Sequence, residues 1–128
     1  MNEVLSISIL SFNRLEIFRE NLLHLLEQVK KHNIAVYISD DSDNDDVEIF
    51  IKEISKKYRN VFYARNKPGL GHDKNYIHSL RLPSSDYVWL LGGSGMIEDE
   101  AIQKVLEVID QSKSDIIAVN AENRHVHN

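Results

Sequence analysis

Residues 4–14 read VLSISILSFNR, and this stretch decides the fold. It begins as a short apolar and β-branched run that Phe12 and Asn13 close, which is the pattern of a buried strand ending in a turn. From Arg14 to His32 the apolar residues recur at steps of three and four, so this segment is predicted to be an amphipathic helix. Asn13 and Glu16 have the spacing of a capping box at its start.

The alternation of strand and helix patterns continues along the chain. Four further strands are expected at 34–39, 61–64, 87–91 and 116–119. Further helices are expected at 45–58, shortly after 71, and at 98–109. Such alternation is typical of a parallel sheet covered on both faces. We therefore predict a single α/β domain over residues 1–128, a Rossmann-like three-layer sandwich with a mainly parallel five-stranded sheet.

The composition of the chain disfavours or excludes several kinds of partner and site. Twenty acidic residues against fifteen basic ones give a formal net charge of −5, which disfavours nucleic acid as a partner. The chain has no cysteine, so disulfides, thiolate metal sites and cysteine nucleophiles are excluded, and the cytoplasm is the expected compartment. The N-terminus lacks the basic region of a signal peptide, and no apolar run is long enough to span a membrane.

Ligands of open parallel sheets bind beyond the carboxyl ends of the strands, so the loops that follow the strands carry the candidate site. In the first loop, Phe12 can stack on a base, or it can belong to the core beside a capping Asn13. In the second, a carboxylate of Asp40 or Asp41 can accept the imide N–H of a pyrimidine. Paired acids at a strand end are equally expected as turn formers or a cation site.

The glycine-containing segment from Gly69 to Lys74 begins like a dinucleotide-binding fingerprint. It lacks the third glycine and follows the third strand instead of the first, so we interpret it as a loop that leads into a helix. Lys74, near the start of that helix, is either a phosphate ligand or a solvated lysine. His125 and His127 form an HxH pair that does not make a metal site without further ligands.

Four motifs in register carry a family resemblance that covers nearly the whole chain. They are SILSFNR at 8–14, ISDDSDND at 38–45, NKPGLGHDKN at 66–75 and DYVWLLG at 86–92. In this order they resemble family 2 glycosyltransferases of the GT-A fold, in particular bacterial enzymes that build cell-surface polysaccharides. The resemblance implies that the partner is a nucleoside diphosphate sugar, whose sugar passes to a hydroxyl acceptor.

The resemblance also implies a nucleotide site. In that family the aromatic residue after the first strand stacks on the nucleobase, which implies Phe12. The second acid that closes strand two binds the base, which implies Asp41 with Asp40 beside it, and the basic residue after strand three implies Lys74. The full set of residues implied in nucleotide binding is Ser11, Phe12, Asn13, Asp40, Asp41, Lys74, Gly92 and Gly93.

The sequence departs from the family pattern after strand four. The family has two or three aspartates there, the DxD motif that holds Mg²⁺ or Mn²⁺, whereas this chain has Gly93, Ser94 and Gly95. We therefore predict no bound metal, and Lys74, Arg65 and backbone N–H groups of the glycine loop are then the candidates to meet the phosphates. The glycine and serine composition also fits an engineered linker. The family continues into an acceptor-binding half that supplies the general base, so this chain is expected to be truncated, and no catalytic residue is assigned.

Three functions compete on the sequence. The first is an inverting glycosyltransferase or its donor-binding fragment, and the second is a catalytically inactive module that keeps the nucleotide pocket. The third is a phospho-acceptor receiver domain, which also has five parallel strands and clustered acids. A receiver needs its acidic pair after strand one, where this chain has Ser11, Phe12 and Asn13. We rank it third.

Overall fold

The computed structural model describes residues 4–92, 97–98 and 100–112. The chain divides into two compact units, residues 1–97 and residues 98–128. The second unit contains α4 (Ala101–Ser112). The first unit contains β1 (Leu5–Ser11), α1 (Leu15–Val29), β2 (Ala35–Asp40), α2 (Asp46–Ile54), β3 (Val61–Arg65), α3 (His72–Arg81) and β4 (Tyr87–Gly92).

The strands that the structure describes form one parallel sheet in the order β3-β2-β1-β4, which confirms the predicted parallel arrangement. β1 has a partner on each side and is buried along its whole length. Ser11 pairs with Asp40, and Asp40 pairs with Arg65. Leu10 pairs with Gly92. The carboxyl ends of these strands therefore lie at one edge of the sheet, and the fifth strand expected at 116–119 falls outside the described residues.

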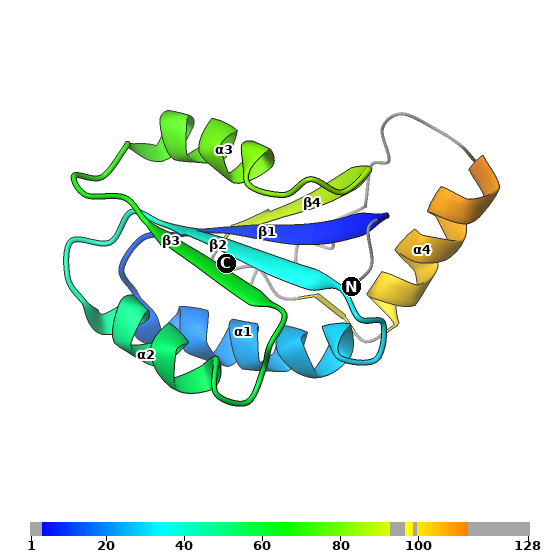
Figure 1. Ribbon diagram of the computed structural model, residues 1–128, viewed down its shortest axis with the longest axis horizontal. Coiled ribbons are helices and arrows are strands. Elements are labelled where there is room, and N and C mark those ends of the chain that lie inside the picture. The colour runs from blue at the N-terminus through cyan, green and yellow to red at the C-terminus, as the bar shows by residue number, and fades with distance from the viewer. Residues whose placement is uncertain (1–3, 93–96, 99, 113–128) are drawn as a thin grey trace, which may run out of the picture. The chain divides into compact units, whose positions relative to one another are not determined.

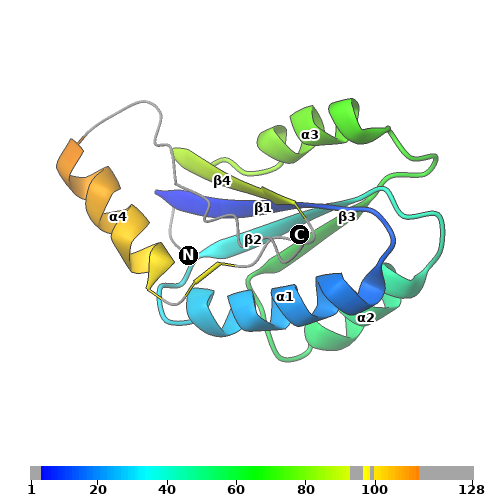
Figure 2. The ribbon, with the colours of Figure 1, turned by 180° about the vertical axis from the view of Figure 1, so that it is seen from behind.

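Helices cover both faces of the sheet, as the pattern predicted. Figures 1 and 2 show α1 and α2 on one face and α3 on the other. Between the sheet and α1 and α2 lies the apolar core, because the helical spacing of their apolar residues places them on one side. Fully burying a large aliphatic or aromatic side chain contributes about 1.5–3 kcal/mol. The buried residues of these two helices are Phe18, Leu22, Leu25, Leu26, Val29, Val47, Ile51 and Ile54.

Helix α3 packs on the sheet through polar side chains. Its buried residues are Asn75 and Ser79. The Ser8 hydroxyl donates to the Ser79 carbonyl at 2.7 Å, and the Asn75 amide donates to the Ser39 carbonyl at 3.2 Å. Apolar residues of this helix are exposed instead, Ile77 by 50%. Hydrogen bonds therefore fix the position of α3, which leads directly out of a loop at the carboxyl edge.

The start of α1 corrects one prediction. Arg14 occupies the cap position in a left-handed conformation with φ 51°, and no side chain caps the helix. The predicted capping box of Asn13 and Glu16 is therefore wrong, because Asn13 bonds to a different loop. Beyond the other end of the helix, Asn33 has φ 56°, a left-handed conformation in which asparagine is enriched.

In the second unit, α4 begins at Ala101 instead of Glu98. The Ala101 N–H donates to the Glu98 carbonyl at 3.2 Å, and Glu100 has φ 72°, so a turn precedes the helix. Glu98 and Glu100 therefore precede the helix, and its first turn contains no acidic residue. His125 and His127 lie outside the described residues. Within the described ranges, no helix has both the length and the apolar character that crossing a membrane requires.

Candidate functional site

The turn after β1 projects Phe12 from the carboxyl edge, where it is 60% exposed. Asn13 and Arg14 follow with φ values of 53° and 51°, which are uncommon outside glycine. The Asn13 N–H donates to the Ser42 hydroxyl at 2.7 Å, and the Asn13 side-chain oxygen accepts the Asp43 N–H at 3.0 Å. These bonds to the neighbouring loop offset the left-handed strain and hold the turn in one conformation.

The two acids that end β2 have different environments. Asp40 is fully buried, and its carboxylate accepts hydrogen bonds from the Ser42 N–H at 3.0 Å and the Ser42 hydroxyl at 2.5 Å. The Tyr63 hydroxyl donates to its other oxygen at 2.5 Å. Burial, together with this bond to Asp40, raises the pKa of Tyr63 above its usual value. Asp40 therefore stabilises the loop from inside.

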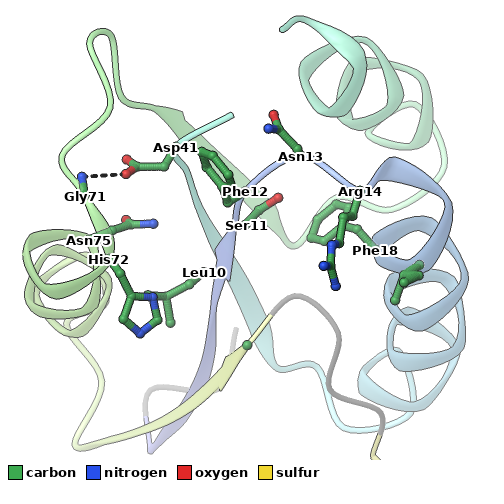
Figure 3. A pocket seen from close by; sticks show the side chains of 12 residues that line it. Leu10, Ser11, Phe12, Asn13, Arg14, Phe18, Asp41, Gly71, His72 and Asn75 are labelled. Carbon is green, nitrogen blue, oxygen red and sulfur yellow. Dashed lines mark hydrogen bonds between the residues drawn. The ribbon is translucent and has the colours of Figure 1, made fainter. Parts of the chain in front are cut away.

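Asp41 holds the glycine loop. Its carboxylate accepts the Gly71 N–H at 2.8 Å (Figure 3). It also accepts the Leu70 N–H at 3.0 Å and the Asn66 amide at 2.8 Å. A Cβ at Gly69 would lie 3.3 Å from the Asp41 carbonyl oxygen, so the loop approaches this residue closely. A carboxylate has about four acceptor positions, so one remains for another donor.

Arg65, expected as a phosphate partner, is committed elsewhere. Its guanidinium forms ion pairs with Asp45 and with Glu48, the latter at 3.0 Å, and its side chain is only 8% exposed. The hydrogen bond to Asp45 raises the pKa of Arg65 and lowers that of Asp45. These contacts tie the end of β3 to α2, so we withdraw Arg65 as a ligand for phosphate.

A cavity of about 610 Å³ lies at the carboxyl edge. Its walls come from the loops after β1, β2 and β3, from the end of β4, and from the first turns of α1 and α3 (Figure 3). Apolar groups dominate, with a few polar groups between them, which is the usual composition of a small-molecule site. The lining residues are Leu10, Ser11, Phe12, Asn13, Arg14, Ile17, Phe18, Asp41, Gly71, His72, Asn75 and Gly92.

The cavity contains part of the predicted site. Most of the predicted residues line it together, namely Ser11, Phe12, Asn13, Asp41 and Gly92. Asp40 faces the interior, and the exposed Lys74 is not among the lining residues. Gly93 lies outside the described residues.

Sequence reasoning missed three polar residues of the cavity, Arg14, His72 and Asn75. Arg14 follows the predicted turn directly, at the position where the sequence predicts the first residue of a helix. His72 and Asn75 belong to the first turn of α3, where the sequence singled out only Lys74. Their position on either side of Lys74 is the signal that was available, because residues three apart on a helix share a face.

The donors of this site do not fit a divalent cation. Mg²⁺ and Mn²⁺ prefer several carboxylate or carbonyl oxygens. Among the described residues, no three His, Cys, Asp or Glu side chains come together as a metal site would need. Asp41 is the only carboxylate among the described residues that line the cavity, and it already accepts three hydrogen bonds. In the sequence, β4 is followed by Gly93, Ser94 and Gly95, whose side chains have no carboxylate either.

Sequence comparison finds one family model and a curated relative that match this chain. The sequence model described as Glycosyl transferase family 2 matches residues 6–127. Abequosyltransferase RfbV of Salmonella typhimurium is 30% identical over 116 residues, which cover 88% of this chain and 34% of that protein.

The fold of this chain is similar to that of several solved structures. The crystal structure of residues 1–349 of S. aureus TarS has a TM-score of 0.73 at 19% identity and covers 86% of this chain and 33% of that chain. Structures of the same protein in complex with UDP and with UDP-GlcNAc have TM-scores of 0.73 and 0.71. The chain thus spans about a third of the length of these relatives.

Proposed function

The chain belongs to glycosyltransferase family 2, and from that membership we propose that it is the nucleotide-sugar-binding half of a glycosyltransferase. The reaction proposed for the whole enzyme transfers a sugar from a nucleoside diphosphate to a hydroxyl acceptor in cell-surface polysaccharide synthesis. This chain spans about a third of the length of its relatives, and we assign the cavity at the carboxyl edge of its sheet to the donor. Its compartment in this proposal is the cytoplasm, with which the lack of cysteine is compatible.

One observation carries the proposal. An exposed aromatic ring, Phe12, and the carboxylate of Asp41 line the same cavity beyond the carboxyl ends of a parallel sheet. A nucleobase can use both groups, since its faces stack on an aromatic ring and an N–H at its edge, such as the ring N–H of uracil or guanine or the amino group of cytosine or adenine, donates to a carboxylate. The acceptor position that Asp41 keeps after its loop contacts is the one that a base would use.

Ser11 also supports a ligand site in this cavity. It is 98% buried at the end of β1 and lines the cavity, and its hydroxyl has no hydrogen-bond partner among the described residues. A buried polar group without a partner costs about 1–3 kcal/mol, and a ligand with a nearby acceptor or donor can recover part of that cost. Ser11 is therefore our proposed polar contact on the floor of the nucleotide site.

A second candidate is a nucleotide-binding module without turnover. The observation that favours it is the replacement of the family's metal-binding acids by Gly93, Ser94 and Gly95. The two candidates share the cavity and differ in whether a sugar is transferred. A radiolabelled transfer assay on the enzyme of full family length separates them.

Calorimetric titration of the chain with UDP, CDP, GDP and ADP tests the proposal for the donor site. We expect one of the four to bind with one-to-one stoichiometry, and the matching nucleoside to compete for the same site. Inorganic pyrophosphate provides the control for binding through charge alone. Absence of binding by all four nucleotides, or equal binding of pyrophosphate, would contradict the proposal.

A further inference from the structure

The diphosphate of a bound nucleotide needs positive charge or free hydrogen-bond donors near the cavity. Phosphate oxygens are strong acceptors, and a charge that is not compensated in a partly closed site is costly. The described residues of the cavity wall do not offer the carboxylates that would hold a divalent cation. The protein itself therefore has to provide the groups that meet the diphosphate.

The obvious donors are already engaged. Arg65 is held in ion pairs with Asp45 and Glu48. The N–H groups of Leu70 and Gly71, which a glycine loop would normally offer to phosphate, both donate to Asp41. Their bonds, at 3.0 Å and 2.8 Å, have ordinary geometry, so using them for phosphate would mean breaking the loop's attachment.

Two basic side chains remain in the cavity wall, Arg14 from the turn after β1 and His72 from the start of α3. Both are exposed to solvent, and within the described part of the chain neither forms an ion pair with a carboxylate. In Figure 3 they approach the cavity from its two walls, on either side of the end of β4. The end of β4 therefore lies between these two basic side chains.

The backbone at Arg14 aims its side chain into the cavity. Both Asn13 and Arg14 adopt left-handed conformations that normally cost energy, and such strain persists where surrounding bonds determine it. Here the bonds of Asn13 to Ser42 and Asp43 do so. A regular first helical turn, as the sequence predicted, would direct position 14 elsewhere.

We propose that Arg14 and His72 bind the diphosphate of the donor nucleotide and do so in place of a divalent cation. This inference rests on the proposed function, because it assigns the diphosphate end of the same site. Arg14 contributes a planar guanidinium that can donate two parallel hydrogen bonds to a phosphate, and His72 adds an imidazole donor from the opposite wall. Nucleotide binding is then independent of metal.

Paired titrations of a nucleoside diphosphate and its nucleoside test the inference. The probes are UDP, CDP, GDP and ADP with uridine, cytidine, guanosine and adenosine, each in Mn²⁺ and in EDTA. Arg14→Gln and His72→Gln remove the proposed contacts. Arg81→Gln, an exposed arginine on α3 that does not line the cavity, is the matched control, and Arg14→Lys keeps the charge without the planar fork.

We expect each glutamine variant to weaken binding of the diphosphate by about tenfold or more, as the loss of a charged hydrogen bond would. Binding of the nucleoside should stay within about twofold of the unmodified chain, and Arg14→Lys should recover part of the loss. Arg81→Gln should change nothing, and Mn²⁺ and EDTA should give the same affinity. Equal melting temperatures verify that the variants fold.

Two results overturn different parts of the account. If the unmodified chain binds a diphosphate and both glutamine variants bind it equally well, or if Mn²⁺ strengthens binding tenfold, the assignment of Arg14 and His72 is wrong while the donor site stands. If the unmodified chain binds neither diphosphates nor nucleosides, the proposed function itself fails.

Discussion

Replacing Asp41 by asparagine tests how the glycine loop is held over the cavity. The carboxylate accepts two backbone N–H groups, from Leu70 and Gly71, and the amide of Asn66. Asparagine keeps the shape of the side chain and one acceptor oxygen. Its NH₂ group replaces the second oxygen, so a donor of the loop would face another donor there. A hydrogen bond to a charged acceptor contributes about 1.5–3 kcal/mol, and Asp41 is 94% buried, so little water can compensate.

We therefore expect Asp41→Asn to lower the free energy of unfolding by about 2–3 kcal/mol, which is the contribution of one hydrogen bond to a charged acceptor. For a chain of this size that corresponds to a melting temperature lower by about 8–12 °C. Amide hydrogen exchange locates the effect, because protection should fall most at Leu70 and Gly71. Asp43→Asn, an exposed acid two positions away, provides the control.

The reasoning would be refuted by a melting temperature within about 2 °C of the unmodified chain together with unchanged exchange at Leu70 and Gly71. That outcome would mean that the loop keeps its position without the carboxylate. A uniform loss of protection over the whole first unit would instead point to global destabilisation and not to a local attachment.

Three further predictions follow from other residues. Phe12→Ala should weaken nucleotide binding by about 1–3 kcal/mol in calorimetry, and because the ring is 60% exposed its melting temperature should hardly change; an unchanged affinity counts against stacking. Gly71→Ala should lower the free energy of unfolding by about 1–3 kcal/mol in thermal melts, because φ at this position is 86° and the added Cβ meets no neighbour that could explain the loss. Gly92→Ala is the control, since its Cβ would also meet open space but its φ is not positive, and it should change the stability only slightly. Gly93→Asp combined with Gly95→Asp should make nucleotide binding depend on Mn²⁺ without producing sugar transfer, which titrations with and without EDTA measure.

The fold was predictable because its signals are local and repeated. The buried run that ends at Ser11 and the helical spacing that follows it recur along the chain, and this alternation specifies a parallel sheet with a common carboxyl edge. The loops that surround the cavity follow from that topology alone. The sequence alone therefore predicts that Phe12 and Asp41 lie at the same edge of the sheet.

Other features depend on contacts between distant loops, which sequence spacing does not contain. Asn13 and Glu16 have the spacing of a capping box, but Asn13 is captured by Ser42 and Asp43 across the edge. Neighbouring residues at a strand end point in opposite directions, so Asp40 and Asp41 had to differ, yet only the packing of Tyr63 identifies Asp40 as the interior one.

Helix α3 shows a further limit of pattern reading. Its apolar residues predict a helix, and a helix is present, but Asn75 and Ser79 face the sheet while Ile77 is exposed. The usual rule that the apolar face is the inner one would orient this helix wrongly. His72 enters the cavity wall because the hydrogen bonds of Asn75 to Ser39 and of Ser8 to the Ser79 carbonyl set that orientation.

The central claim is that a nucleotide binds in the cavity at the carboxyl edge of the sheet. Chemical-shift mapping of the ¹⁵N-labelled chain during titration with the tightest-binding nucleoside diphosphate tests it most directly. The account predicts the largest amide shifts at residues 11–14, at Asp41 and at residues 70–75. Binding that instead shifts the amino ends of the strands, near residues 35, 61 and 87, and leaves Phe12 and Asp41 unperturbed would contradict it.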